Sequence, residues 1–182
     1  MQTDTPPTQQ ELLEAIRAAT GEVFATMLNL ELQQEDGFLT REGAAPASGL
    51  VSIIGLAGSW VGTGSVSCSA KLACQIASQL LLADCSGIDD EVLDAMAEVT
   101  NMIIGNVKTK LEERLGGMGL STPTVIYGRN FQTRSARNQE WTVAPFSVLG
   151  ERMFVQICIA PNKDAADRPI RPGFPIPHVL NI

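Results

Sequence analysis

The sequence predicts an α+β domain in which long helices pack on a largely antiparallel sheet. The order of the periodic segments indicates this class, because a helix and a hairpin precede two helices and three further strands. Strands that follow each other through short turns favour antiparallel pairing. The chain has 182 residues, of which 45% are hydrophobic and 18% charged. It can therefore bury a core as one domain, and its composition is not that of a disordered chain.

The N-terminal part predicts one helix after a short leader. Residues 1–8 are polar and contain two prolines, so we expect a flexible leader there. Thr8 followed by Glu11 is a capping-box pattern, and apolar residues then recur at helical spacing as far as Leu30. Residues 33–48 are polar and rich in glycine, alanine and proline, and we expect a loop.

The next segments predict a hairpin followed by a helix. Two apolar runs, residues 50–57 and 60–68, lie on either side of Gly58 and Ser59, which can form the turn. A helix is then predicted over residues 71–83. We expect its apolar face to consist of Leu72, Ile76, Leu80 and Leu81.

The second half of the chain predicts the longest helix and three strands. Ser86 or Asp89 can cap a helix that ends at Leu115, where glycines follow. The expected strands are residues 122–128, 140–149 and 152–160, with a polar loop at 129–139. The predicted domain spans residues 9–160, and residues 161–182 form a proline-rich C-terminal extension.

Charge and hydropathy exclude several classes of function. The formal net charge of −7 disfavours binding to nucleic acids and to anionic membranes. No stretch approaches the roughly 20 apolar residues that a transmembrane helix needs. The N-terminus lacks the basic and apolar regions of a signal peptide, so we expect a cytoplasmic protein.

The cysteines and the single histidine argue against most familiar catalytic sites. The four cysteines show no CxxC spacing, and we expect reduced thiols and no metal site. His178 stands alone near the C-terminus, which argues against Ser-His-Asp and Cys-His enzymes. No phosphate-binding loop of the GxxxxGK[ST] type is present. Any catalysis must use carboxylates and amides, or borrow groups from a partner.

One polar stripe follows the predicted helix that ends at Leu115. At about 100° per residue its members fall close to one line, and the apolar residues lie around the rest of the helix. The stripe consists of Asp94, Glu98, Asn101, Gly105 and Lys108. Such a stripe is usually a solvated face. Asparagine is nevertheless a poor helix former and is unusual on a solvated face, and the glycine lets another backbone or side chain come close, either for docking of a partner or for packing inside the domain.

The segment from Leu93 to Leu111 resembles the signature helix of the CheC/CheX/FliY family of chemotaxis phosphatases. The family pattern places an Asp or Ser, a Glu and an Asn on one helix, followed by a proline. Here the pattern reads Asp94, Glu98, Asn101 and Pro123. Residues 53–68 also resemble the hairpin of CheX-type domains, and the similarity covers roughly residues 10–160.

The resemblance implies a phosphatase that hydrolyses the aspartyl phosphate of a CheY-like response regulator. It implies that Asn101 orients the attacking water and that Glu98 pairs with the regulator's lysine, with Asp94, Gly105 and Pro123 as supporting residues. The chain then needs no cofactor of its own, and Mg²⁺ belongs to the partner. The alternative is a catalytically silent CheX-like module that binds a signalling partner or dimerises.

The resemblance also bears on the number of sites and on assembly. Some family members carry a second Glu-x-x-Asn motif on the first helix, but here Glu22 is followed by Ala25 where the asparagine is needed. We therefore expect a single active site, as in CheX-like members. Those members tend to pair through their sheets, and we expect a homodimer.

Overall fold

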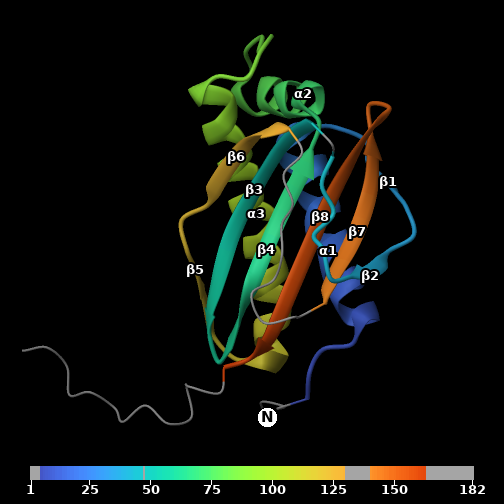
Figure 1. The fold of residues 1–182 in the computed structure, drawn as a ribbon, viewed down its shortest axis with the longest axis vertical. Helices are drawn as coiled ribbons and strands as arrows, with labels where there is room; N and C mark the ends of the chain where they lie inside the picture. Colours follow the sequence, from blue (N-terminus) through green and yellow to red (C-terminus); the bar gives the residue numbers. More distant parts are fainter. Residues whose placement is uncertain (1–4, 47, 130–139, 163–182) are drawn as a thin grey trace, which may run out of the picture.

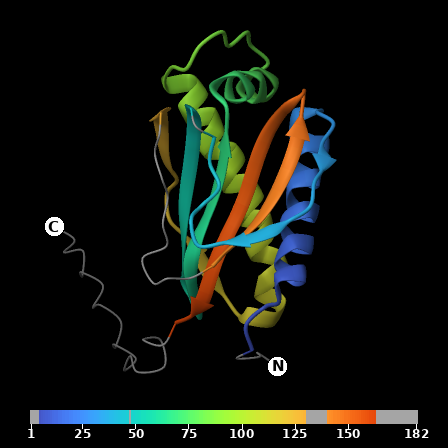
Figure 2. The same ribbon diagram turned by 45° about the vertical axis from the view of Figure 1, so that its right-hand side comes forward.

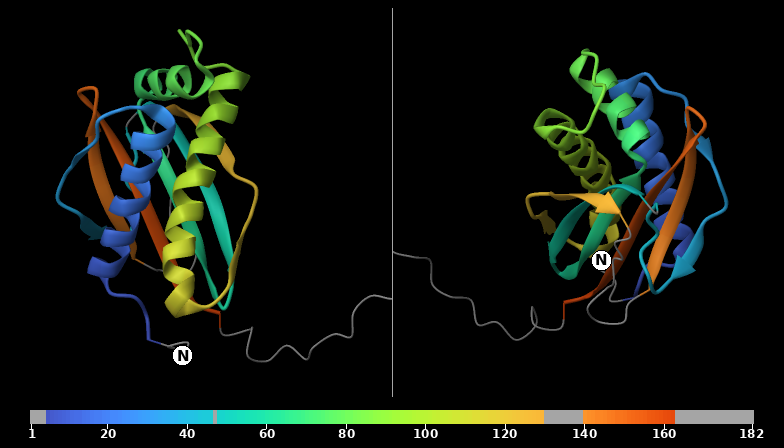
Figure 3. Two further views of the ribbon diagram at one scale, coloured as in Figure 1. Left: turned by 180° about the vertical axis from the view of Figure 1, so that it is seen from behind. Right: turned by 45° about the horizontal axis from the view of Figure 1, so that its top comes forward.

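The predicted α+β class is confirmed by a computed structural model, in which helices cover one face of an antiparallel sheet (Figures 1 and 3). The structure describes residues 5–46, 48–129 and 140–162. Residues 1–4 of the predicted leader, residues 130–139 of the loop predicted at 129–139 and residues 163–182 of the extension predicted at 161–182 lie outside the described residues. None of the described helices is long and apolar enough to cross a membrane.

The predicted helices form, and the caps expected for the first and the longest of them are present. The helices are α1 (Gln9–Val23), which continues as the π-helical turn η1 (Phe24–Leu28), α2 (Ala70–Leu81) and α3 (Asp90–Leu115). The capping box of Thr8 and Glu11 is present at the start of α1. Ser69 caps α2, and the Asp89 carboxylate accepts a hydrogen bond of 2.9 Å from the Val92 N–H at the start of α3.

The predicted strands also form, together with short strands that the sequence pattern missed. The long strands are β3 (Ser48–Gly58), β4 (Trp60–Cys68), β6 (Thr124–Arg129), β7 (Trp141–Val148) and β8 (Glu151–Pro161). The short ones are β1 (Gln33–Gln34), β2 (Phe38–Thr40) and β5 (Met118–Leu120). The loop expected over residues 33–48 is thus partly wrong, because β1 and β2 pair with β7.

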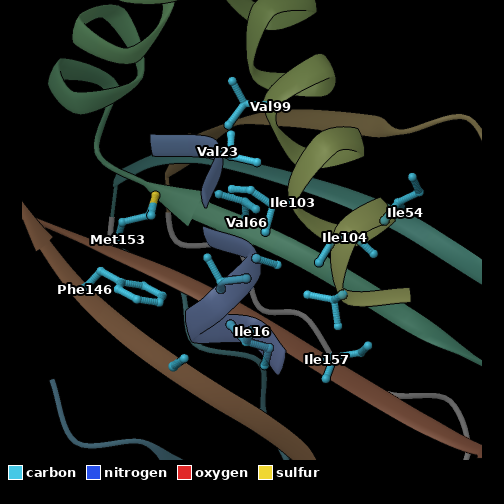
Figure 4. Packing of buried hydrophobic residues seen from close by; sticks show 14 of the residues in the cluster. Ile16, Val23, Ile54, Val66, Val99, Ile103, Ile104, Phe146, Met153 and Ile157 are labelled. Carbon is cyan, nitrogen blue, oxygen red and sulfur yellow. The ribbon is translucent and has the colours of Figure 1, made fainter. Parts of the chain in front are cut away.

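The described strands form one eight-stranded sheet in the order β1-β7-β8-β4-β3-β5, with β2 also on β7 and β6 also on β3. Helices α1 and α3 lie side by side on one face of this sheet, and α2 crosses one end of it (Figures 1 to 3). The core lies between the two layers. Ile16 of α1 and Ile103 of α3 meet sheet residues such as Val66 and Phe146 there (Figure 4).

Gly64 on β4 brings α3 close to the sheet. A Cβ atom added at Gly64 would come within 2.8 Å of Ile104 on α3, which is closer than carbon atoms can approach. Ile104 is fully buried at this contact. The close approach fixes which face of α3 is buried and therefore which face is left to solvent.

The opposite face of the sheet is partly covered by the segment before β3. The backbone of Ala44 bonds to the Gln156 side chain, with its N–H donating over 2.8 Å to Oε1. Ser67 Oγ donates to the Ala44 carbonyl oxygen, and Gln156 Nε2 donates to Ser65 Oγ. These bonds satisfy polar groups that are buried on the sheet, as burial requires.

Candidate functional site

The exposed face of α3 carries the residues of the predicted stripe. Ten residues of α3 are buried, among them Met96, Val99, Ile103 and Ile104. Asp94 and Glu98 are exposed, and Asn101, Gly105 and Lys108 are partly exposed. The structure therefore brings together the residues that the sequence placed on one line of the helix.

Glu98 and Asn101 lie on successive turns of α3, about 4.5 Å apart along the helix axis. Within the described part of the chain, neither side chain makes a hydrogen bond or an ion pair. Some other glutamates have cationic partners, as Glu112 does with Lys108 at 2.7 Å and Glu151 with Lys71 at 3.0 Å. The carboxylate of Glu98 and the amide of Asn101 are thus free to bind groups from outside the domain.

From the start of α3 to Glu98, every charged side chain of the helix is a carboxylate. Asp94 stands four residues before Glu98, and like charges at this spacing weaken a helix by about 0.2–0.5 kcal/mol. Glu91 lies one further turn toward the N-terminus and is also exposed. The local surface therefore favours a cationic group from a partner.

Lys108 and Gly105 have different environments on the same stripe. The Lys108 ammonium forms an ion pair with Glu112. The hydrogen bond from Lys108 is the largest cause of the lowered pKa of Glu112. A Cβ added at Gly105 would meet only Leu120 Cδ1, at 3.8 Å, which is an ordinary contact. Packing inside the domain therefore does not require a glycine at position 105.

Pro123 is not part of the polar stripe on α3. It lies outside α3, in the connection between β5 and β6, and directly precedes β6. This position agrees with a residue that shapes the entry to a strand, because proline lacks the N–H that a ladder would use.

An open groove adjoins Glu98 at the end of α2. Its volume is about 540 Å³, and it is lined by Leu80, Leu81, Ala83, Glu91, Asp94, Ala95 and Glu98. The sequence pattern did not indicate this groove, because it places Leu81 on the apolar face of α2, whereas Leu81 is exposed. The signal was the run of three leucines at 80–82, since one face of a helix cannot bury three consecutive residues.

Cys68 and Cys74 are not activated thiols. Burial raises the pKa of the Cys68 thiol to about 12, and burial is also the first cause of the raised pKa of Cys74. A thiol with a raised pKa stays protonated near neutral pH and is a poor nucleophile. Neither thiol belongs to α3, where the partly or fully exposed side chains of the stripe are carboxylates, an amide and an ion-paired lysine.

A comparison with protein families identifies one match. The family described as Chemotaxis phosphatase CheX matches residues 50–147, a region that contains the hairpin β3–β4, helices α2 and α3, and the strands up to β7. No curated protein sequence matches the chain.

Solved structures of similar fold come from several bacteria. The chemotaxis protein CheX from Vibrio vulnificus is 27% identical, with a TM-score of 0.73 over 82% of this chain and 99% of its own. A CheC-like superfamily protein from Shewanella sp. PV-4 is 26% identical, with a TM-score of 0.72 over 82% and 97%. CheX in the CheX–CheY–BeF3–Mg²⁺ complex from Borrelia burgdorferi is 28% identical, with a TM-score of 0.71 over 82% and 97%.

Proposed function

This chain belongs to the family of the chemotaxis phosphatase CheX, and from this premise we propose that it hydrolyses the aspartyl phosphate of a CheY-like response regulator. The observation that carries the proposal is the unpaired carboxylate and amide of Glu98 and Asn101 on successive turns of an exposed helix. The relative from Borrelia burgdorferi was solved in complex with CheY, which supports a partner of this kind.

Asn101 is the proposed catalytic residue. An aspartyl phosphate is an activated acyl phosphate, so the phosphatase needs only to place a water molecule in line with the phosphorus and stabilise its approach. A side-chain amide has both a donor and an acceptor and can hold this water without adding charge. A carboxylate at the same position would repel the phosphoryl oxygens.

Glu98 is the proposed docking residue. Its carboxylate would pair with the lysine beside the phosphorylated aspartate of the receiver domain, and the negative charge of Asp94 supports this attraction. Charge pairs of this kind fix the register of a complex more than they add affinity. Gly105 has no side chain and so allows the receiver to come close to the helix next to Asn101. Pro123 shapes the entry to β6.

The remaining elements of the reaction belong to the partner. We assign Mg²⁺ to the receiver domain and no cofactor to this chain. Residues 9–160 contain every group that the proposal uses.

We also propose a homodimer in which copies pair through strand β6, where Ile126 and Tyr127 are exposed. A receiver domain of this class places the activity in the cytoplasm.

The test of the function is the substitution Asn101→Ala in a phosphate-release assay with a phosphorylated CheY-like receiver. We expect the wild type to shorten the lifetime of the phosphorylated receiver. We expect Asn101→Ala to lower the rate of hydrolysis by about 10²- to 10³-fold, as the loss of a preorganised polar group does in other active sites. The melting temperature should stay near that of the wild type, because the amide has no partner in the described fold.

The matched control is Asn106→Ala, which removes the same amide from the same helix. Asn106 is turned about 140° away from Asn101 at 100° per residue and should leave hydrolysis unchanged. A loss below threefold for Asn101→Ala would contradict its catalytic role. A wild type that binds the phosphorylated receiver without hydrolysing it would instead support the catalytically silent module.

A further inference from the structure

The connection between α2 and α3 lies at one end of the molecule (Figures 1 and 3), and apolar side chains are exposed beside it. Leu81 ends α2 with an exposed fraction of 42%, and Leu82 follows with 91%. Leu82 has a φ of 52° and a ψ of 38°, a left-handed conformation in which its N–H closes the helix on the Ser78 carbonyl. Leu80 lies in the last turn before them. These residues, Leu80, Leu81 and Leu82, are called the leucine corner below.

Leucine at position 82 lowers the stability of the fold relative to glycine. The left-handed conformation costs a residue with a Cβ atom roughly 1 kcal/mol, and glycine usually occupies this position at the end of a helix. The Leu82 side chain recovers none of this cost through burial, since it is almost entirely exposed. Strain and exposure alone do not mark a contact, but Leu82 directly follows the exposed Leu81, which lines a groove shared with Glu98, and such a group of exposed apolar residues beside a groove is expected where a partner covers it.

The groove beside the leucine corner shares Glu98 with the proposed active site. Leu80 and Leu81 line one wall of the groove, and Asp94 and Glu98 line the other. None of the described residues that line it is basic, so its charge complements an apolar side chain that is flanked by basic groups. Because Glu98 belongs to both features, a receiver domain bound at Glu98 and Asn101 would lie next to this groove.

We propose that the leucine corner is a second contact for the phosphorylated receiver domain, and this inference rests on the proposed function. The corner takes an apolar side chain of the receiver that has lysine or arginine beside it. The polar ridge of Glu98 and Asn101 provides register and chemistry. The leucine corner provides the apolar burial from which most binding free energy comes.

The test uses Leu82→Gly and Leu81→Ser in steady-state dephosphorylation of a CheY-like receiver. We expect either change to raise KM about tenfold, the equivalent of one lost buried leucine contact, while kcat stays within twofold. Leu82→Gly should not lower the melting temperature, because glycine accepts the left-handed conformation. Weaker binding without loss of stability is the signature that a structural role would not produce.

The matched control is Leu149→Gly. Leu149 has a φ of 50° and an exposed fraction of 52%, and it lies in the β7–β8 turn. The neighbouring Glu151 pairs with Lys71 in the first turn of α2, so this turn lies at the opposite end of α2 from Leu82. The control should leave both KM and kcat at wild-type values.

The outcomes separate this inference from the proposed function. An unchanged KM for Leu82→Gly, with hydrolysis still dependent on Asn101, overturns the leucine corner and leaves the function intact. If the wild type hydrolyses no receiver, titration with a BeF3-loaded CheY-like receiver decides, and an equal Kd for wild type and Leu82→Gly overturns the inference. A change in the oligomeric state of the free protein, with KM unchanged, assigns the corner to a second copy of the chain and also overturns it.

Discussion

At the scale of single residues, several side chains on the exposed face of α3 lower the stability of the helix. Asn101 is a poor helix former because its amide competes for backbone hydrogen bonds. Asp94 and Glu98 repel each other at a spacing of four residues, and no described cation pairs with either. Stability is commonly lost where a surface serves a function, so these costs agree with the proposed site.

The substitution Glu98→Lys separates stability from docking. We expect it to raise the free energy of unfolding by about 0.2–0.5 kcal/mol, because the introduced ammonium stands four residues after Asp94 and attracts it. We expect KM for the phosphorylated receiver to rise, because like charges then face each other in the complex. Chemical denaturation and receiver titration measure the two effects.

Glu113→Lys is the control for this charge change. Glu113 is exposed on the same helix, five residues or more from every residue of the proposed site. It changes the net charge by the same amount and should leave KM at its wild-type value at physiological ionic strength. Equal binding of the receiver by wild type and Glu98→Lys would rule out a docking role for Glu98.

At the scale of elements, α3 is held from one side and left open on the other. Gly64 permits the close approach of Ile104, and Asp89 and the residues after Leu115 fix the ends of the helix. Glu112 joins the C-terminal end to β5 by accepting a hydrogen bond of 2.7 Å from the Met118 N–H. The helix is therefore rigidly placed on the sheet, which a site built from its outer face requires.

The prediction for this element concerns Gly105. Because an added Cβ meets only an ordinary contact, Gly105→Ala should raise the free energy of unfolding by about 1 kcal/mol through helix propensity. Gly105→Leu should fold and raise KM more than Gly105→Ala does, because the larger side chain keeps the receiver away from Asn101. Thermal denaturation and steady-state hydrolysis measure these effects.

Gly21→Ala provides the comparison for Gly105. Gly21 lies within α1, and a Cβ added there meets no atom within 4 Å. It should raise stability by a similar amount, about 1 kcal/mol, without affecting KM. If Gly105→Leu binds the receiver as tightly as the wild type does, the hypothesis that the receiver comes close to the helix at position 105 is wrong.

The elements were predicted unequally well, for a physical reason. Helices with caps and a period of 3.6 residues, and the hairpin around Gly58 and Ser59, carry their signals locally. The short strands β1 and β5 carry almost none, because they consist of a few polar or glycine-rich residues. They are strands only because β7 and β3 offer free edges beside them.

At the scale of the whole molecule, ion pairs connect elements that are distant in the sequence. Arg114 of α3 pairs with Glu11 of α1, and Arg152 of β8 pairs with Glu35. Lys71 of α2 pairs with Glu151 of β8, and the Lys71 hydrogen bond is the largest cause of the lowered pKa of Glu151. The pKa values of Glu11, Glu35 and Glu112 are lowered as well.

These pairs predict how stability depends on pH. A carboxylate whose pKa is lower in the folded than in the unfolded state stabilises the fold above the unfolded value, here about 4.5. The free energy of unfolding should therefore fall as the pH drops below about 4.5 and these glutamates take up protons. Urea denaturation between pH 7 and pH 3 measures the decline.

Glu151→Gln tests the origin of this decline. Removing a carboxylate with a lowered pKa should lower stability at pH 7 and make the profile flatter between pH 5 and pH 3. A profile for Glu151→Gln that runs parallel to that of the wild type would mean that Lys71 and Ser69 do not stabilise the charged form.

The sequence by itself determined the class of the fold, the three long helices expected of it and the line of Glu98 and Asn101 on one of them, because caps and periodicity depend on neighbouring residues. The tertiary structure alone decided that this line faces outward, that Gly105 is not needed for packing, and that Leu81 and Leu82 stand exposed beside Glu98. Exposure and close approach depend on atoms brought together from distant parts of the chain, and no local pattern records them.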